Sequence, residues 1–554
     1  MKKRGTKEGK RTGSERPLKD DCARYVKRIP RIEDIAEEDR TPLVVTLIEI
    51  IQLQQEQIQA LRDEIARLRG QKPRPKIKPS KLEKGLGHGE AKDVEGKRPG
   101  SLKRSKTSEL VIDETLVIKP DNLPAGSRFK GYQDYTVQDI VFRAYNTRFR
   151  LERWQGPKGE TILGKLPDEV AGKHYGPGLL SYVLYQYYQG HVTQPLILEQ
   201  LWELGVDISA GEVNRIITEG KERFHEEKDE ILRVGLEISG HVNVDDTGAR
   251  HKGKNGYCTH IGNELFAWFQ STESKSRINF LKLLCGDRSE YVINIYALDY
   301  MSAQNLPRFQ LERLGGCGKG VFEDESTWKA ALESMGFTTE LHTRIATEGA
   351  LLGSIVQNGL INPELVIVSD EAGQFAVLLH ALCWIHAERG INKLVGYNDA
   401  QRKALEGVRT QIWDFYAELK AYKEEPCEEK KRELEARFDE IFGTSTCCQS
   451  LNLALKRIRN NKSELLFVLD RPDIPLHNNT SERDIREYVK KRKISGSTRS
   501  DLGRCCRDTF TSLKKTCRKL NVSFWDYIRD RVLGRNTILP LSDLMHQQAR
   551  QPPG

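Results

Sequence analysis

The sequence lacks any apolar run long enough to cross a bilayer. The longest, LVVTLIEIIQL at 43–53, is short and interrupted by polar residues, whereas a membrane-spanning helix needs about 20 consecutive apolar residues. The opening stretch, MKKRGTKEGKRTGSERP, has no apolar centre of the kind that a secretory signal peptide carries. Both absences predict a cytoplasmic protein with no membrane partner.

Paired cysteines are also missing. The 11 cysteines show no Cys-x-x-Cys spacing, and in a chain of 554 residues this indicates reduced thiols rather than a disulfide framework. Such a length is sufficient for several domains and at least one large core.

Positive charge is concentrated in two regions. The chain carries a net charge of +9, but residues 71–106 hold 12 Lys/Arg against 4 Asp/Glu, and residues 483–519 hold 13 against 4. The rest of the chain is therefore mildly acidic. Two such basic regions predict binding to a polyanion, in particular a nucleic acid. Each region alone remains compatible with a solvated linker or a surface helix.

Apolar residues recur with a period of 3.5 near the N-terminus. The heptad positions are Val44, Leu47, Ile51, Gln54, Ile58, Leu61, Ile65 and Leu68. This spacing predicts a coiled coil over 41–70 and hence a homo-oligomer, with a helix packed inside its own chain as the alternative. Residues 1–40 are predicted to be a disordered basic tail, and 71–110 a flexible basic linker rich in Lys, Gly and Pro.

The next two segments differ in pattern. Residues 111–170 contain short alternating runs that predict a small β-rich domain, and residues 171–237 are predicted to be helical. Within the latter, LILEQLWELGVDISAGEVNRIITEG predicts one helix, a turn at Gly205, an N-cap at Ser209 and a second helix. This is the pattern of a helix-turn-helix, although any helical hairpin with a glycine turn has it too.

From residue 238 the pattern is α/β. HVNVDDTGA and PELVIVSDEAG predict strands, YCTHIGNELFAWFQ predicts two strands joined at 262–263, and SKSRINFLKLLCG and FAVLLHALCWIHAERGINKL predict helices. The fold class is therefore multidomain α/β with helical parts. Its core parts span 238–285, 361–399 and 469–500, its insertions span 286–360 and 400–468, and a basic helical region with a tail spans 501–554.

Three acids stand at positions suited to metal binding. Asp245 and Asp370 follow apolar strand residues, and Glu482 lies in the first turn of a predicted helix. Carboxylates in this number can hold two Mg²⁺ ions, which would clamp a phosphodiester. The alternatives are that Asp370 caps a helix and that Asn479 and Glu482 form a capping box.

The first ligand position has two candidates. Strand alternation places Val242, Val244 and Asp246 on one face and Asn243 and Asp245 on the other. This pattern separates the two acids without showing which of them binds a metal.

The helix that follows Glu482 is rich in cations. Helical spacing places Arg486, Lys490 and Lys493 on the same side as Glu482, which predicts contacts with DNA phosphates. Arg483 and Arg499 are further candidate DNA contacts, and SGSTRS at 495–500 could form a loop of backbone donors for a phosphate.

CWIHAERG contains a Cys-x-x-His spacing. Cys383 and His386 would share one face of a predicted helix. A structural zinc site needs four ligands, and no second pair is evident, so packing or a DNA contact by His386 is favoured.

The order of VDDTG (244–248), VSD (368–370), CWIHAER (383–389) and NNTSERDIR…KKRKISGSTRSDLG (478–503) resembles the transposases of the insertion sequence 66 family. The similarity extends from the coiled coil to about residue 533. It implies a DDE transposase with an RNase H-like core, in which Asp245, Asp370 and Glu482 are catalytic and bind two Mg²⁺ ions, with Mn²⁺ as a substitute. Its partners would be double-stranded DNA ends and target DNA, in the nucleoid of a bacterial cytoplasm.

The chain departs from that family in two places. Many members carry a cysteine-rich zinc module, but the matching region at 118–155 has no cysteine, so zinc is not expected. Asp246 occupies a place where the family usually has Glu. Two rival functions remain: a catalytically silent DNA-binding protein that retains the fold, and an RNase H-like nuclease without strand transfer. The sequence leaves open whether accessory proteins take part.

Overall fold

The computed structural model describes residues 112–118, 127–130, 132–133, 135–137, 139–167, 171–286, 288, 290–318 and 320–550, together with Val44 and Gln54. The chain divides into two compact units, one of residues 1–32 and 145–554 and the other of residues 33–144. The predicted coiled coil lies outside the described residues except for Val44 and Gln54, both of which are helical. The predicted tail and basic linker also lie outside them. No described helix is both long and apolar enough to cross a membrane.

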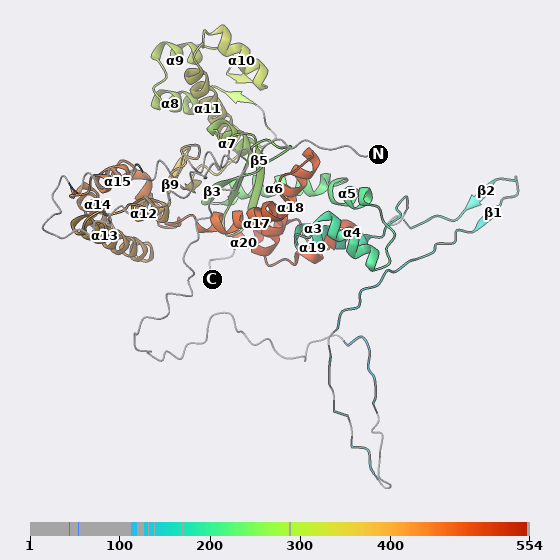
Figure 1. Ribbon diagram of the computed structural model, residues 1–554. Helices are drawn as coiled ribbons and strands as arrows, with labels where there is room; N and C mark the ends of the chain where they lie inside the picture. Colours follow the sequence, from blue (N-terminus) through green and yellow to red (C-terminus); the bar gives the residue numbers. More distant parts are fainter. Residues whose placement is uncertain are drawn as a thin grey trace, which may run out of the picture. The chain divides into compact units, whose positions relative to one another are not determined.

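A five-stranded mixed sheet forms the centre of the larger unit (Figure 1). Its strands, in spatial order, are β5 (Ala267–Thr272), β4 (Tyr257–Gly262), β3 (His241–Gly248), β8 (Val366–Ser369) and β9 (Leu379–Leu382). β3, β4 and β5 pair in antiparallel fashion, while β3, β8 and β9 are parallel. The predicted pair of strands joined at 262–263 is confirmed as β4 and β5. The chain is thus confirmed as mixed α/β.

The register of the parallel strands brings two acids together. His241 pairs with Val366, and Asn243 pairs with Val368. Continued for two residues, this register sets Asp245, which lies within β3, beside Asp370, which directly follows the last residue of β8.

A long helix closes the free edge of β5. Along α18 (Asp501–Lys519), side-chain oxygens at every fourth residue accept hydrogen bonds from alternate backbone N–H groups of β5. The pairs are Ala267 with Thr516 at 3.1 Å, Phe269 with Ser512 at 2.9 Å and Ser271 with Asp508 at 2.7 Å. Buried edge groups that a sixth strand would have paired are therefore satisfied by side chains.

Four helices precede the sheet: α3 (Pro177–Tyr188), α4 (Gln194–Glu203), α5 (Ala210–Thr218) and α6 (Glu222–Ile238). The predicted hairpin is confirmed, since Gly205 has φ 78° and the Ser209 side chain caps α5 by accepting from the Glu212 amide. On α5, Arg215 forms an ion pair with Glu212, so the helix offers little free positive charge to DNA.

Two helical segments interrupt the sheet. The first follows α7 (Arg277–Cys285) and contains β6 (Tyr291–Val292), α8 (Ile295–Ala303), α9 (Arg308–Gly315), β7 (Val321–Phe322), α10 (Glu325–Ser334) and α11 (Glu340–Gln357). The second contains α12 (Trp384–Asn392), α13 (Asp399–Glu424), α14 (Glu428–Gly443), α15 (Gln449–Asn460), α16 (Lys462–Leu465) and a 3₁₀ turn at Phe467–Leu469.

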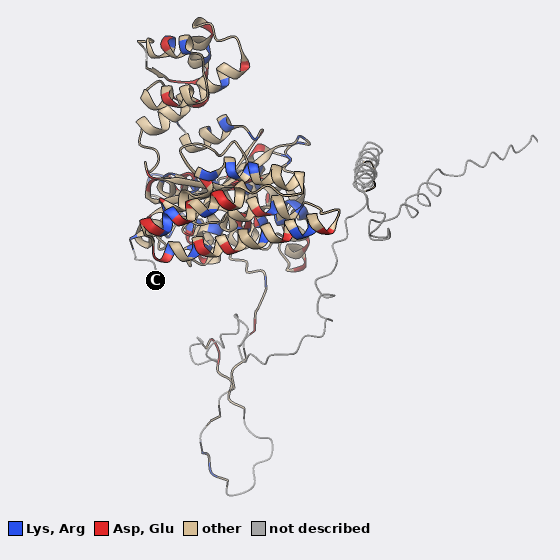
Figure 2. Ribbon diagram, turned by 90° about the vertical axis from the view of Figure 1, so that its left-hand side faces the viewer, with Lys and Arg blue, Asp and Glu red and all other residues tan. Residues whose placement is uncertain are grey.

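The second segment packs in an apolar core that it shares with β8 and β9, and Trp384 is buried there. Acidic and basic residues are interspersed along α13 and α14 (Figure 2). After it come α17 (Asn479–Ser495), α18, α19 (Phe524–Leu533) and α20 (Leu541–Ala549).

Two sequence predictions of secondary structure are wrong. The helix predicted from FAVLLHALCWIHAERGINKL is instead β9 followed by α12, because Leu378 takes a left-handed φ of 57° that no helix can continue through. In the predicted β-rich segment, the described residues form only the hairpin of β1 (Arg153–Gln155) and β2 (Thr161–Leu163).

Candidate functional site

The three acids singled out in the sequence lie near one another. Burial raises the pKa of Asp245 to about 7, and the negative charges of Asp370, Asp246 and Glu482 add to that increase. The carboxyl group of Asp245 receives one hydrogen bond from the Asp246 amide, at 2.7 Å. Burial and the repulsion from neighbouring carboxylates both destabilise the charged form of Asp245, and a bound divalent cation would offset both effects.

The structure separates the roles of Asp245 and Asp246. Asp246 forms an ion pair with Lys275 and accepts a hydrogen bond from Gln374 Nε2 at 2.8 Å, so its charge is already compensated. Asn243 lies on the same face of β3 as Asp245, as strand alternation predicted, and contacts α17. Asp245 is therefore the acid on the face that α17 covers.

Asp370 does not cap a helix. Its Oδ1 atom accepts a hydrogen bond from the Ala372 amide at 3.0 Å and so closes a turn. The next regular element is the strand β9, not a helix. The helix-capping alternative for Asp370 is consequently wrong.

Glu482 does not belong to a capping box. The N-cap of α17 is Asn478 rather than Asn479, and its side chain makes no capping hydrogen bond. Glu482 instead pairs with Arg389 on α12, with Nη1 3.0 Å from Oε1 and Nη2 3.5 Å from Oε2. His386 Nε2 lies 3.5 Å from the same Oε1 atom. The third acid is thus held by a cation in this structure.

That ion pair bears on metal binding. Within the part of the chain that the structure describes, no three His, Cys, Asp or Glu side chains stand together ready to hold a metal ion. Asp245 and Asp370 are adjacent, but Glu482 is engaged with Arg389. Completing a three-carboxylate site requires the Glu482 side chain to leave Arg389.

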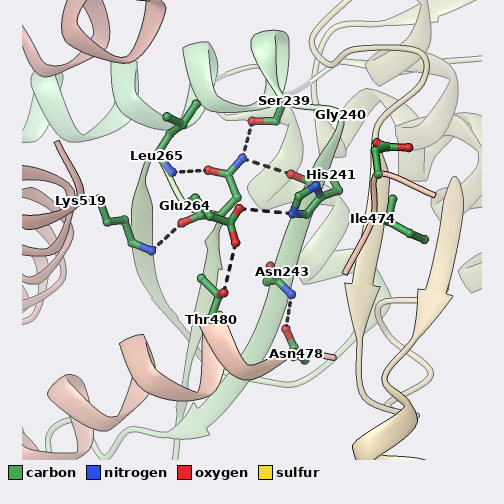
Figure 3. Close-up of polar contacts among 12 residues, drawn as sticks. Ser239, Gly240, His241, Asn243, Glu264, Leu265, Ile474, Asn478, Thr480 and Lys519 are labelled. Carbon is green, nitrogen blue, oxygen red and sulfur yellow. Dashed lines mark hydrogen bonds and ion pairs between the residues drawn. The ribbon is translucent and has the colours of Figure 1, made fainter. Parts of the chain in front are cut away.

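Asn478 fixes the start of α17 against the sheet. It is fully buried, accepts a hydrogen bond from Asn243 Nδ2 at 2.9 Å (Figure 3) and donates one to the Val244 carbonyl at 2.8 Å. Its backbone N–H donates to Cys383 Sγ at 3.2 Å. The first asparagine of NNTSE and the cysteine of CWIHAER therefore position Glu482, a role that sequence analysis did not assign.

Cys383 and His386 do not share a helix face. Cys383 is the buried N-cap residue of α12, whereas His386 lies in the helix and points to Glu482. The prediction of a common face is wrong because α12 begins at Trp384, so that Cys383 precedes the helix instead of lying within it. Burial raises the pKa of the Cys383 thiol, which fits a packing role.

A second contact holds α17 to the turn between β4 and β5 (Figure 3). The Thr480 hydroxyl donates to Glu264 Oε1 at 3.4 Å, and His241 Nε2 lies 3.4 Å from Glu264 Oε2. The hydrogen bond with His241 lowers the pKa of Glu264 to about 2.

The buried side of α17 is also polar. Asp484 lies 2.8 Å from Lys515 Nζ, 2.9 Å from Lys519 Nζ and 3.3 Å from His260 Nε2. His260 stands opposite Asp245 in the β3–β4 register and places Nδ1 2.7 Å from Ser481 Oγ. This network fixes the face that α17 presents to the sheet.

The cations of α17 divide into two groups. Those predicted to contact DNA are all exposed: Arg483, Arg486, Lys490 and Lys493, together with Arg499 in the following loop. Lys491 is buried instead, and its Nζ donates to the Tyr187 carbonyl at 2.8 Å. The run of cations at 490–493 is therefore partly structural.

The loop at 495–500 is not a free nest of donors. The Thr498 amide donates to the Arg250 carbonyl at 3.2 Å, and the Lys252 amide donates to the Thr498 carbonyl at 2.9 Å. These bonds join the loop to the hairpin between β3 and β4.

Comparison with known proteins identifies the family. Residues 367–504 match the model of the transposase IS66 family, a range that includes Asp370, Arg389 and Glu482 but not Asp245. The chain is also 42% identical over 322 residues to the uncharacterized protein y4jO of Sinorhizobium fredii, a match that covers 58% of this chain and 100% of that protein. The chain therefore contains a transposase IS66 family domain, at residues 367–504.

Proposed function

We propose that this protein is a DNA transposase that cleaves a phosphodiester at the ends of its mobile element and joins the freed 3′-hydroxyl to target DNA. The observation that carries the proposal is the register of β3 and β8, which sets Asp245 beside Asp370, with Glu482 supplied by α17. A sheet of three antiparallel strands followed by two parallel ones supports an RNase H-like core.

The donor set fits magnesium. Asp245, Asp370 and Glu482 offer only carboxylate oxygens, the ligands that this small, hard cation prefers. The burial that raises the pKa of Asp245, together with the pairing of Glu482 with Arg389, supports a site that attracts positive charge. When bound, Mg²⁺ would activate the attacking oxygen and stabilise the leaving oxygen.

The residues of the chain itself hold and orient the DNA. Arg486, Lys490 and Lys493 are exposed along α17 beyond Glu482, so they would bind the phosphates that flank the scissile bond. Arg483, Arg499 and His386 would add contacts. Asn478 keeps α17 fixed against β3, and this contact preserves the spacing between Glu482 and the two aspartates.

The test removes charge while keeping shape. Purified Asp245→Asn, Asp370→Asn and Glu482→Gln proteins would be mixed with Mg²⁺ and a labelled duplex taken from the DNA that flanks the gene. All three should retain DNA binding and lose both cleavage and strand transfer, since one site serves both steps. Asp246→Asn, whose carboxylate is committed to Lys275 and Gln374, should retain cleavage.

The same assay separates the rival functions. A catalytically silent DNA-binding protein would bind the duplex without cutting it. An RNase H-like nuclease would cut it and yield no joined product. Full cleavage by Glu482→Gln would remove Glu482 from the proposed site.

A further inference from the structure

A cationic cavity lies beyond the C-terminal end of β3. It has a volume of about 380 Å³ and is enclosed by the hairpin at 249–256, the end of β5, Thr498 and the first turn of α18. Four fixed cations line it, namely Arg250, Lys252, Lys254 and Arg504. Its acids are Glu273 and Asp501, so its lining carries an excess of two positive charges.

The cavity wall is built from two distant parts of the sequence. Thr498 forms a bridge with His251, and the two side chains place Oγ1 2.8 Å from Nδ1. Together with the backbone bonds at Arg250 and Lys252, this contact fixes the hairpin to the end of α17. The cations are therefore presented by an ordered wall rather than by a free loop.

One carboxylate, that of Asp501, pairs with two of the four fixed cations. Asp501 lies 2.5 Å from Lys252 Nζ, 2.9 Å from His251 Nε2 and 3.4 Å from Arg504 Nη2. Asp501 is itself exposed, and so are Arg250 and Lys254. A phosphate approaching the cavity would meet the exposed Arg250 and Lys254 and would compete with Asp501 for Arg504.

The separation between the cavity and the acids gives the number of nucleotides between the phosphate in the cavity and the scissile bond. β3 runs from Asp245 directly into the hairpin, and Ala249 follows after four residues, or roughly 13 Å at about 3.3 Å per residue. On duplex DNA, whose axial spacing is about 3.4 Å per nucleotide, this is about four nucleotides.

We propose that this cavity binds a backbone phosphate of the same duplex that is cut at the acids, about four nucleotides from the scissile bond. Arg250, Lys254 and Arg504 make the contacts, and Arg504 gives up its ion pair with Asp501 when the phosphate binds. The inference rests on the proposed function, because it places the substrate of that site on a second surface.

The test measures counterion release. A fluorescent 30-bp duplex of arbitrary sequence is titrated with protein by anisotropy over a series of salt concentrations, where each phosphate contact contributes a slope of about 0.9 in log K against log salt. The triple variant Arg250→Gln, Lys254→Gln, Arg504→Gln removes the contact with one phosphate and should reduce that slope by about 0.9. A matched triple variant in the first inserted segment, Arg308→Gln, Lys329→Gln, Arg344→Gln, removes three exposed cations, each paired with a glutamate, and should leave the slope unchanged.

Asp501→Asn tests the inference in the opposite direction. Removing the competing carboxylate should tighten duplex binding, roughly two- to fivefold at low salt, whereas loss of a merely structural contact would weaken it. Equal melting temperatures of variant and parent establish that each variant is folded. An unchanged slope in the cavity variant with duplex binding intact overturns this inference and leaves the proposed function standing. A parent protein that binds no duplex overturns both.

Discussion

The pairing of Glu482 with Arg389 can be tested by the single substitution Arg389→Gln. In the structure the Arg389 guanidinium binds the Glu482 carboxylate. A metal ion that binds Glu482 would have to compete with Arg389 for it. Without it, Glu482 remains near Asp245 and Asp370 with no arginine to compensate its charge. The variant should therefore be less stable without Mg²⁺ and should bind Mg²⁺ more tightly.

The expected size of the effect follows from exposure. The Arg389 side chain is 44% exposed and that of Glu482 19% exposed, so solvent screens the pair. Ion pairs of this kind contribute up to about 1 kcal/mol. A metal that no longer competes with Arg389 should gain a similar amount, which is about fivefold in affinity.

Calorimetric titration of Mg²⁺ and the melting temperature with and without Mg²⁺ would measure this effect. The stabilisation caused by Mg²⁺ should be larger in Arg389→Gln than in the parent. Arg308→Gln, which removes an arginine from an exposed pair with Glu312 on α9, is the control and should behave as the parent does. A Mg²⁺ affinity that stays the same or falls would refute the idea that Arg389 competes for Glu482.

Three further outcomes are expected. Deleting residues 41–70 should reduce the oligomeric state measured by light scattering; an unchanged number of protomers would argue against the coiled coil. Asn478→Ala should destabilise the fold by about 2–4 kcal/mol, seen as a lower melting temperature, because it leaves the buried Asn243 amide and Val244 carbonyl without their partners. Burial, reinforced by nearby cations, lowers the pKa of Lys491 to about 7, so the folded state disfavours its charged form and parent stability should rise as pH increases from about 7 toward 10.5. The gain in melting temperature of Lys491→Met over the parent should accordingly be largest near pH 7 and shrink toward pH 10, and a gain independent of pH would contradict this.

Local periodicity predicted part of the site. Alternation along 242–246 assigned Asp245 and Asp246 to opposite faces, and the structure gives them different partners. The strand before Asp370 and the helix of Glu482 were also predicted correctly, because a short buried strand and the start of a helix each have a local sequence pattern.

The contacts that organise the site could not be predicted from the sequence. Arg389 and Glu482 are 93 residues apart, and Asn478 and Asn243 are 235 apart. No local pattern encodes such pairs, because they arise only when the chain packs. β9 was missed for a related reason: its four residues, Leu-His-Ala-Leu, lie in a mostly apolar segment that fits either a strand or a buried helix, and the backbone at Leu378 decides between them.

The side-chain ladder of α18 on β5 has a consequence for self-association. An unpaired edge strand is a template on which another chain can add a strand, and so a route to aggregation. Here alternate backbone N–H groups of the edge strand β5 already donate to the side chains of Thr516, Ser512 and Asp508. The opposite edge is β9, only four residues long, and it packs against α16. With one edge satisfied and the other only four residues long, the sheet is a poor template for a strand from another molecule.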